Sequence, residues 1–296
     1  MFGSASRATS GEHWITNNVV FNTSSNAVHG NDTVWVSSQD GVLTLEPSAT
    51  HGTLESYCFG NLYVTNGGTI ECRSQGDMPP HDTNAQGVAI MVAGDLIVGE
   101  DSSITATGQG FVHLQGPAPA DNQPGLTQHA SHGGQGYLNP VVYGSPTEPT
   151  TLGSGGRNGG NNGGGAICLD VGRALALNGR IEANGMWTSS SSYGASAGGS
   201  VRIRAAHLTG HGLITANGGT SPESTVGAGG GRIAVYYRNN SFADLPPPGL
   251  YTGEQAVSAS VTVKGGYNRD ADGLEDGSLC VGIRKAGPKA AVLIVR

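Results

Sequence analysis

The side chains best suited to acid–base chemistry gather in one glycine-rich stretch of the sequence, residues 109–164. Two histidines and a tyrosine lie in its motif HASHGGQGY, and an arginine follows in the same stretch. An imidazole or phenol base beside a cationic side chain is an arrangement that a lyase can use to remove a proton. The catalytic candidates are therefore His129, His132, Tyr137 and Arg157. Their alternative role is structural, because the same side chains could hydrogen-bond the stretch onto its neighbours.

Aromatic and basic side chains outside this motif could bind a sugar chain. Aromatic rings stack on sugar rings, and three such residues lie in two glycine-rich segments. Two arginines alternate with apolar residues in the run SVRIRAA, so on a strand both would face outward. The substrate-binding candidates are Tyr143, Trp187, Tyr193, Arg202 and Arg204. Loop packing for the rings, and a solvated strand face for the arginines, are the alternatives.

One acidic stretch, NRDADGLED at residues 268–276, has part of the spacing of a calcium loop. Oxygen-bearing side chains fall at positions 1, 3, 5 and 9, with Gly273 at position 6. Leu279 stands where the bidentate glutamate of position 12 belongs, so a solvated acidic turn is the alternative. The metal candidates are Asn268, Asp270, Asp272 and Asp276. No cofactor is required by the sequence, and calcium is the one that it suggests.

An internal repeat supplies the elements that would position these residues. The segment Asn61–Gly76 aligns without a gap with Asp95–Gly110, at an offset of 34 residues, and further copies begin at Gly87, Gly165 and Gly199. Each copy holds three short runs of alternating apolar and polar residues, which predict three short strands per unit. Stacked units would share a core. One inward row should contain Leu62, Leu96, Leu175 and Leu208.

The repeat predicts an all-β stack of three-strand coils that forms a single domain over residues 1–296. Residues 1–40 are expected to cap one end of the stack, and residues 109–164 to form one long insertion. Each departure from the repeat follows the third strand of a unit, so the insertions should project from one corner. The glycines that close each unit would permit sharp turns or close approach of backbones.

The three-strand coil resembles the right-handed parallel β-helix of the pectate-lyase-like superfamily. The motif HASHGGQGY, with YGSPTEPTTLGSGG, GGGAICLDV, GASAGGSVRIRAA and GAGGGRIAVYY, is similar to a glycine-rich repeat of large secreted or surface-anchored β-helix proteins. The likeness covers about residues 41–237. It implies an all-β, right-handed parallel β-helix with insertions projecting from one corner. Lyases, glycoside hydrolases, phage tailspikes and adhesins share this architecture, so it does not choose among functions.

Composition excludes some partners and favours others. The formal net charge is −7, with only 15 lysines and arginines in 296 residues, which argues against nucleic acid. No run of about 18 apolar residues occurs, so no membrane span is expected. The sequence begins without a basic-plus-apolar signal pattern, and we interpret it as a trimmed chain. The low charge and the many small polar residues are typical of secreted repeat proteins, which predicts an extracellular or cell-surface location.

These observations favour a non-catalytic extracellular surface or adhesion module that presents loops to a polysaccharide, a cell-surface glycan or another partner. The absence of an evident pair of acidic residues supports this interpretation, because sugar hydrolysis usually needs two neighbouring carboxyl groups. The alternative is a carbohydrate-active enzyme, either a polysaccharide lyase or a glycoside hydrolase, that works along the edge from which the insertions project.

The four cysteines show no metal-binding spacing. The alignment places Cys58 and Cys72 at inward positions of one coil, where a bridge between them is conceivable. It places Cys168 and Cys280 three coils apart, which is about 14 Å at the ~4.8 Å spacing of strands. Because a disulfide needs Cα atoms within about 7 Å, no bridge is expected between those two.

Overall fold

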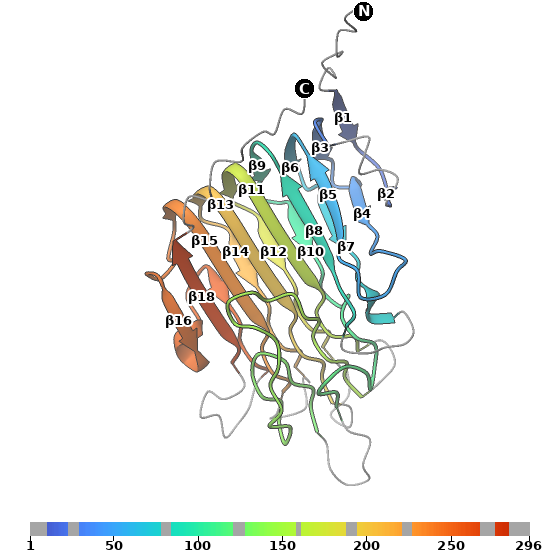
Figure 1. Cartoon of the computed structure of the whole chain (residues 1–296), viewed down its shortest axis with the longest axis vertical. Coiled ribbons are helices and arrows are strands. Elements are labelled where there is room, and N and C mark those ends of the chain that lie inside the picture. Colours follow the sequence, from blue (N-terminus) through green and yellow to red (C-terminus); the bar gives the residue numbers. More distant parts are fainter. Residues whose placement is uncertain are drawn as a thin grey trace, which may run out of the picture.

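A computed structural model describes residues 11–22, 30–77, 84–120, 128–157, 161–187, 194–220, 227–266 and 276–283. The regular structure in these ranges is almost entirely β, apart from two short 3-10 helices, η2 (Gln75–Asp77) and η3 (Gly253–Ala256). The strands form two sheets (Figure 1). No helix in these ranges is long and apolar enough to cross a membrane.

The larger sheet, called sheet A here, has eleven strands. Its main path runs through β1 (Glu12–Ile15), β3 (Thr33–Ser37), β6 (Asn61–Thr65), β9 (Leu96–Val98), β11 (Ala166–Leu177), β13 (Ser200–Gly210), β15 (Arg232–Phe242), β18 (Ser278–Ile283) and β16 (Gly249–Thr252). Two further strands lie beside that path: β5 (Glu55–Phe59) pairs with β8 (Val88–Val92), and β8 pairs with β11.

Seven shorter strands form the second sheet, called sheet B. In order they are β2 (Val19–Phe21), β4 (Val42–Leu45), β7 (Thr69–Cys72), β10 (Ser103–Thr105), β12 (Arg180–Glu182), β14 (Leu213–Thr215) and β17 (Val261–Thr262). Neighbouring strands in this sheet pair in parallel. In sheet A the terminal β16–β18 pair is antiparallel, whereas the other described pairs are parallel.

Equivalent side chains of successive units lie in register and fill the core. The predicted leucine row is confirmed, since each of its members pairs with the next and none is exposed: Leu62, Leu96, Leu175 and Leu208. Sheet B has a matching buried row of Ile70, Ile104, Ile181 and Ile214. Both rows belong to one apolar cluster. The alternation read from the sequence therefore places the core correctly.

The first two predicted strands of a unit merge in the later units. Residues 167–171 of β11 pair with β8, and residues 175–177 of the same strand pair with β9. The register shifts between Val171 and Ala174, which marks an irregularity within one long strand. The prediction of three separate strands is therefore wrong for β11, β13 and β15, where one long strand in sheet A replaces two. A short polar run does not interrupt a strand when its backbone can still pair with neighbours.

The insertions do share one edge of the molecule. Each begins after a strand of sheet B and returns to a strand of sheet A, and the loops gather at the lower end of the view in Figure 1. The connecting segments are 73–87, 106–165, 183–199, 216–231 and 263–277.

Close approach of backbones explains the glycines at positions 198 and 230, whereas Gly108 has the positive φ of a sharp turn. Gly198 and Gly230 are not among the described glycines with positive φ. A Cβ atom at Gly198 would collide with the carbonyl oxygen of Ala216, and one at Gly230 with that of Val263. Neighbouring segments pass too near for any side chain, which is the second of the two reasons expected from the sequence.

The described part of residues 1–40 extends both sheets. β1 pairs in parallel with β3, and β2 pairs in parallel with β4. These two strands are the outermost of their sheets in Figure 1. The described strands continue the ladders of both sheets, and a cap formed by residues 1–40 stays a prediction.

The cysteines occupy different faces and are all free thiols. Cys72 is buried in the core, as predicted. Cys58 pairs with Met91 and is half-buried, so the alignment that placed it inward is wrong by one residue. Cys168 and Cys280 share an outward row but are separated by β13 and β15, as the repeat predicts.

Candidate functional site

The long insertion buries the two histidines that the sequence marks as catalytic candidates. His129 and His132 are both fully buried. Nδ1 of His132 lies 2.7 Å from the carbonyl oxygen of Gly198, so Nδ1 carries the proton and donates it. Nε2 then accepts a 2.7 Å hydrogen bond from the hydroxyl of Thr151. Burial, with a smaller contribution from the positive charge of Arg232, lowers the pKa of His132 to about 3.

His129 is hydrogen-bonded through one ring nitrogen, whereas its buried Nε2 has no partner among the described residues. Its Nδ1 accepts a 3.2 Å hydrogen bond from the backbone N–H of Ala195, so Nε2 carries the proton. The edge of the imidazole meets the ring of Tyr137 at a centroid distance of 6.3 Å and an angle of 85°. Burial lowers the pKa of His129 to about 4. Both histidines are therefore neutral in the folded protein at neutral pH and out of reach of a substrate.

Thr151 and Arg232, which the sequence did not single out, complete the contacts around His132. Nε of Arg232 donates a 2.7 Å hydrogen bond to the carbonyl oxygen of Tyr143, and Nη1 donates to the hydroxyl of Ser278 at 2.8 Å. The phenol of Tyr143 donates to the carbonyl oxygen of Leu152 at 2.7 Å. Burial raises the pKa of Tyr143 above its ordinary value. We call this set the anchor cluster: His132, Tyr143, Thr151 and Arg232.

The anchor cluster ties the insertion to the beginnings of two long strands. Gly198 lies two residues before β13 begins at Ser200, and Arg232 is the first residue of β15. Beside it, the carbonyl oxygen of Gly230 accepts hydrogen bonds from the backbone N–H groups of Gly133 and Gly134, at 2.9 and 2.8 Å. The alternative structural role therefore describes these side chains better than acid–base catalysis does.

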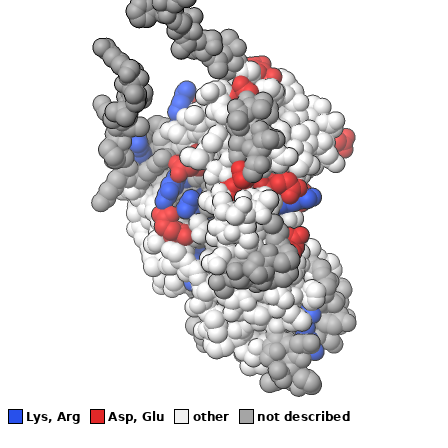
Figure 2. Space-filling view, turned by 45° about the vertical axis from the view of Figure 1, so that its right-hand side comes forward, with Lys and Arg blue, Asp and Glu red and all other residues white. Residues whose placement is uncertain are grey.

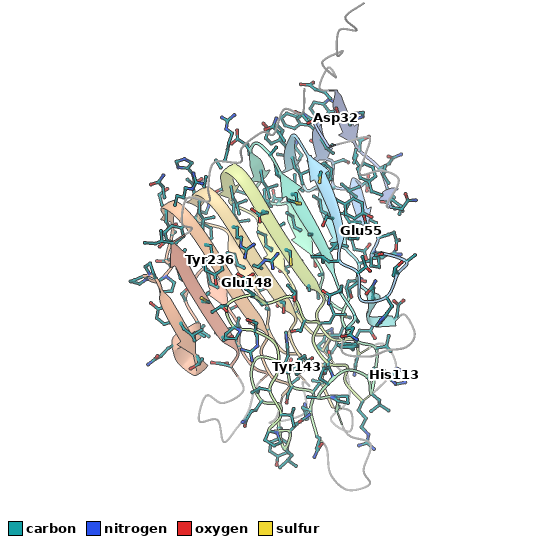
Figure 3. All side chains as sticks on the ribbon, in the orientation of Figure 1. Asp32, Glu55, His113, Tyr143, Glu148 and Tyr236 are labelled. Carbon is teal, nitrogen blue, oxygen red and sulfur yellow. The ribbon has the colours of Figure 1, made fainter. Side chains whose placement is uncertain are left out.

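The two outward arginines of β13 are paired with acidic side chains. Arg204 Nη2 lies 2.6 and 2.7 Å from the two carboxylate oxygens of Glu148, and Arg202 Nη1 lies 3.2 Å from one of them. Asp170 contacts Arg204 at 3.7 Å. Figure 3 shows Glu148 beside Tyr236, whose hydroxyl donates a 2.6 Å hydrogen bond to the carbonyl oxygen of Thr147. Arg202 and Arg204 face outward on β13, as predicted, but acidic side chains of the same chain neutralise their charge.

The buried anchor cluster, rather than these ion pairs, should supply most of the stability of the insertion. The side chain of Glu148 is 49% exposed, and exposed ion pairs contribute little. The change Glu148→Gln is therefore expected to lower the free energy of unfolding by about 1 kcal/mol or less, as measured by urea denaturation. Glu100→Gln, in an exposed turn, is the matched control. A loss of several kcal/mol specific to Glu148→Gln would contradict the assignment of the insertion's stability to the anchor cluster.

The other predicted site residues do not come together among the described residues. Trp187 is 59% exposed at the edge where the insertions project, whereas Tyr193 lies outside the described residues. Arg157 is half-buried, and its backbone N–H donates to the carbonyl oxygen of Gly194. Tyr143 is hydrogen-bonded inside the anchor cluster, and a sugar-binding role for Trp187 and Tyr193 stays a prediction.

The calcium prediction falls mostly outside the described residues. Asn268, Asp270 and Asp272 are not described, and a carboxylate oxygen of Asp276 accepts a 2.8 Å hydrogen bond from the N–H of Gly265. In the described ranges, no group of three histidine, cysteine or acidic residues could hold a metal ion. Calcium binding by residues 268–276 stays a prediction.

A different aromatic cluster lies on the outward face of sheet A. The ring of Trp14 stacks on Trp35 with centroids 4.8 Å apart and planes 5° from parallel. Tyr63 continues the row, 4.3 Å from Trp35. We call these three residues the aromatic ladder. Part of the signal for it is present in the sequence, since Trp35 and Tyr63 stand between apolar residues in VWV and LYV and so face outward on their strands. Trp14 precedes the apolar Ile15 but follows the polar His13.

The chain matches no family model, no curated protein and no solved structure.

Proposed function

We propose that this protein is a right-handed parallel β-helix that acts as a non-catalytic surface or adhesion module, binding a glycan or another partner outside the cell. The helical path is supported by the way the chain alternates between sheets while equivalent residues stay in register. A right-handed turn is supported by the strong preference for that hand when parallel strands of one sheet are joined by a crossover.

The observation that carries the non-catalytic proposal is the burial of the two histidines of the insertion, while Tyr137 and Arg157 are half-buried. Both histidines are inside the protein, and the hydroxyl of Tyr143 is hydrogen-bonded to the chain. A general base must come within hydrogen-bond reach of the proton that it removes. The two arginines that could neutralise a substrate carboxylate already contact Glu148. What remains accessible is a rigid surface, which suits binding better than proton transfer.

The distribution of charge also supports a binding module for uncharged partners. Figure 2 shows that uncharged side chains make up most of this face, and that acidic and basic side chains lie next to one another on it. Charged residues are only 12% of the chain. Such a surface does not attract a polyanion over long distances. The abundance of small polar residues favours an extracellular or cell-surface location for the module.

The proposal predicts binding without turnover. The purified chain is expected to bind at least one immobilised polysaccharide in affinity electrophoresis. It should release no reducing ends from neutral polysaccharides and no ultraviolet-absorbing unsaturated products from uronate polysaccharides. A heat-denatured sample is the control in each assay. Product formation that disappears on denaturation would contradict the proposal and favour the alternative, a carbohydrate-active enzyme of the lyase or hydrolase type.

A further inference from the structure

One end of the aromatic ladder offers an unused ring face. Trp14 lies on β1, the outermost described strand of sheet A, and only one of its faces meets Trp35. Its side chain is 58% exposed, which is consistent with an open second face. Among the described residues, Trp35 has a neighbouring ring on each side and Tyr63 lies farther along the row, so Trp14 is the ring at the outer end. Glu12 and Thr16 are exposed two residues away on either side, where the alternation of a strand places them on the same face.

A polar hollow lies just beyond the same strand. It has a volume of about 580 Å³ and is lined by Asn17, Asn18, Gln39, Asp40 and Val42. The asparagines belong to the turn between β1 and β2, and Gln39 and Asp40 belong to the turn between β3 and β4. Amide side chains both donate and accept hydrogen bonds, and a carboxylate accepts them. This combination suits the hydroxyl groups of a sugar.

The ring and the hollow are close enough to serve one ligand. Three residues of extended chain separate Trp14 from Asn17, which is about 10 Å. An oligosaccharide of a few sugar units can therefore stack one ring on Trp14 and place others against the amides. An aromatic surface with a few polar groups is the usual composition of a ligand site.

The charge of the region selects among sugars. Glu12 and Asp40 are acidic, and neither the hollow's lining nor the outward face of β1 contributes a lysine or arginine. A uronate or sulfated sugar would be repelled by these carboxylates, whereas a neutral sugar would not. We infer that the exposed face of Trp14 and the hollow beside it form a binding site for a neutral oligosaccharide. This site rests on the proposed glycan-binding function and gives it a location away from the insertions.

Isothermal titration of the full chain with neutral hexasaccharides, such as cellohexaose, xylohexaose and mannohexaose, tests the site. At least one of them is expected to bind. Trp14→Ala should weaken that binding by about tenfold or more, because it removes the stacking surface. Asn17→Ala should also weaken it, and this variant leaves the ladder intact if Trp14→Ala fails to fold. Leu250→Ala is the matched control, because Leu250 is 55% exposed on β16 at the other end of sheet A, and its loss should leave binding unchanged. Trp187→Ala tests the other candidate surface, where Trp187 is 59% exposed.

The possible results of the titrations distinguish a wrong binding site from a wrong function. Binding that survives both Trp14→Ala and Asn17→Ala, or that is lost in Trp187→Ala, would overturn the site and leave the glycan-binding function standing. Tighter binding of hexagalacturonate than of every neutral probe would overturn the ligand class. A dimer that dissociates on Trp14→Ala, seen by light scattering, would identify a second copy as the occupant instead. Failure of the wild-type chain to bind any hexasaccharide would overturn the site, whereas the glycan-binding function is tested separately by affinity electrophoresis with immobilised polysaccharides.

Discussion

Replacing Gly230 with alanine is expected to lower the free energy of unfolding by about 3 kcal/mol or more, enough to prevent stable folding of many proteins. A Cβ atom at this position would collide with the carbonyl oxygen of Val263 and would lie 2.8 Å from the amide nitrogen of Gly277. Both are backbone atoms, so no side-chain rotation can make room. Gly230 also accepts two backbone hydrogen bonds from the long insertion, and any shift of its carbonyl would strain them.

Gly99→Ala is the matched control for Gly230→Ala. The nearest atom to a Cβ at Gly99 is the carbonyl oxygen of Val64, at 3.5 Å, an ordinary contact distance. Gly99 is not among the described glycines with positive φ, so alanine can adopt its backbone conformation. Its substitution should change the stability by less than about 1 kcal/mol, in either direction. Urea denaturation followed by circular dichroism measures both variants, and equal losses in the two would show that backbone crowding is not the reason for the closing glycines.

The core could be predicted from the sequence because its period is local. A residue such as Leu96 alternates with polar neighbours in its own unit and repeats at a fixed distance in the next, and these two patterns fix both its face and its row. Burial on one face then sets the register, because a shift by one residue would expose the whole row. The outward direction of Arg202 and Arg204 follows from the same alternation.

The surroundings of the candidate site residues could not be predicted, because the insertion has no period. His132 pairs with Gly198, a contact across 66 residues, and Glu148 reaches Arg204 across 56. A segment without a repeat has no sequence pattern that shows which strands it packs against. The sequence therefore identifies histidines that are unusual, and only the packing decides that they are buried anchors. The aromatic ladder is the opposite case, because its alternation was visible and needed only the correct register of the first strands.

The two histidines of the insertion are buried and neutral, so the stability of the folded protein should depend on pH. An exposed histidine is protonated equally in the folded and unfolded states, whereas a buried one is not. The pKa values of His129 and His132 fall to about 4 and about 3 in the folded protein, mainly through burial. In the unfolded chain both return to about 6.5. The free energy of unfolding should therefore depend on pH through these two side chains.

The expected result is a steep loss of stability on mild acidification. Below about pH 6.5 the unfolded chain binds protons that the folded chain does not, so the free energy of unfolding falls as the pH falls. Each histidine should contribute about 1.4 kcal/mol per pH unit, down to its folded-state pKa. Between about pH 6.5 and pH 5, the two together should remove roughly 3 kcal/mol, since the unfolded histidines are only half protonated at the upper limit. Urea denaturation at a series of pH values measures this slope.

Variants at the two histidines test whether these side chains cause the pH dependence of stability. His129→Phe keeps a ring of similar shape and leaves the N–H of Ala195 without its partner, so it should lower the stability at neutral pH by about 1–3 kcal/mol. It should also reduce the pH dependence by about 1.4 kcal/mol per pH unit, because one titrating group is gone. His132→Gln, which retains a donor and an acceptor, should reduce the slope by a similar amount. A slope that is unchanged in both variants would place the acid sensitivity elsewhere, and the two imidazoles would then have to be accessible to protons in the folded protein.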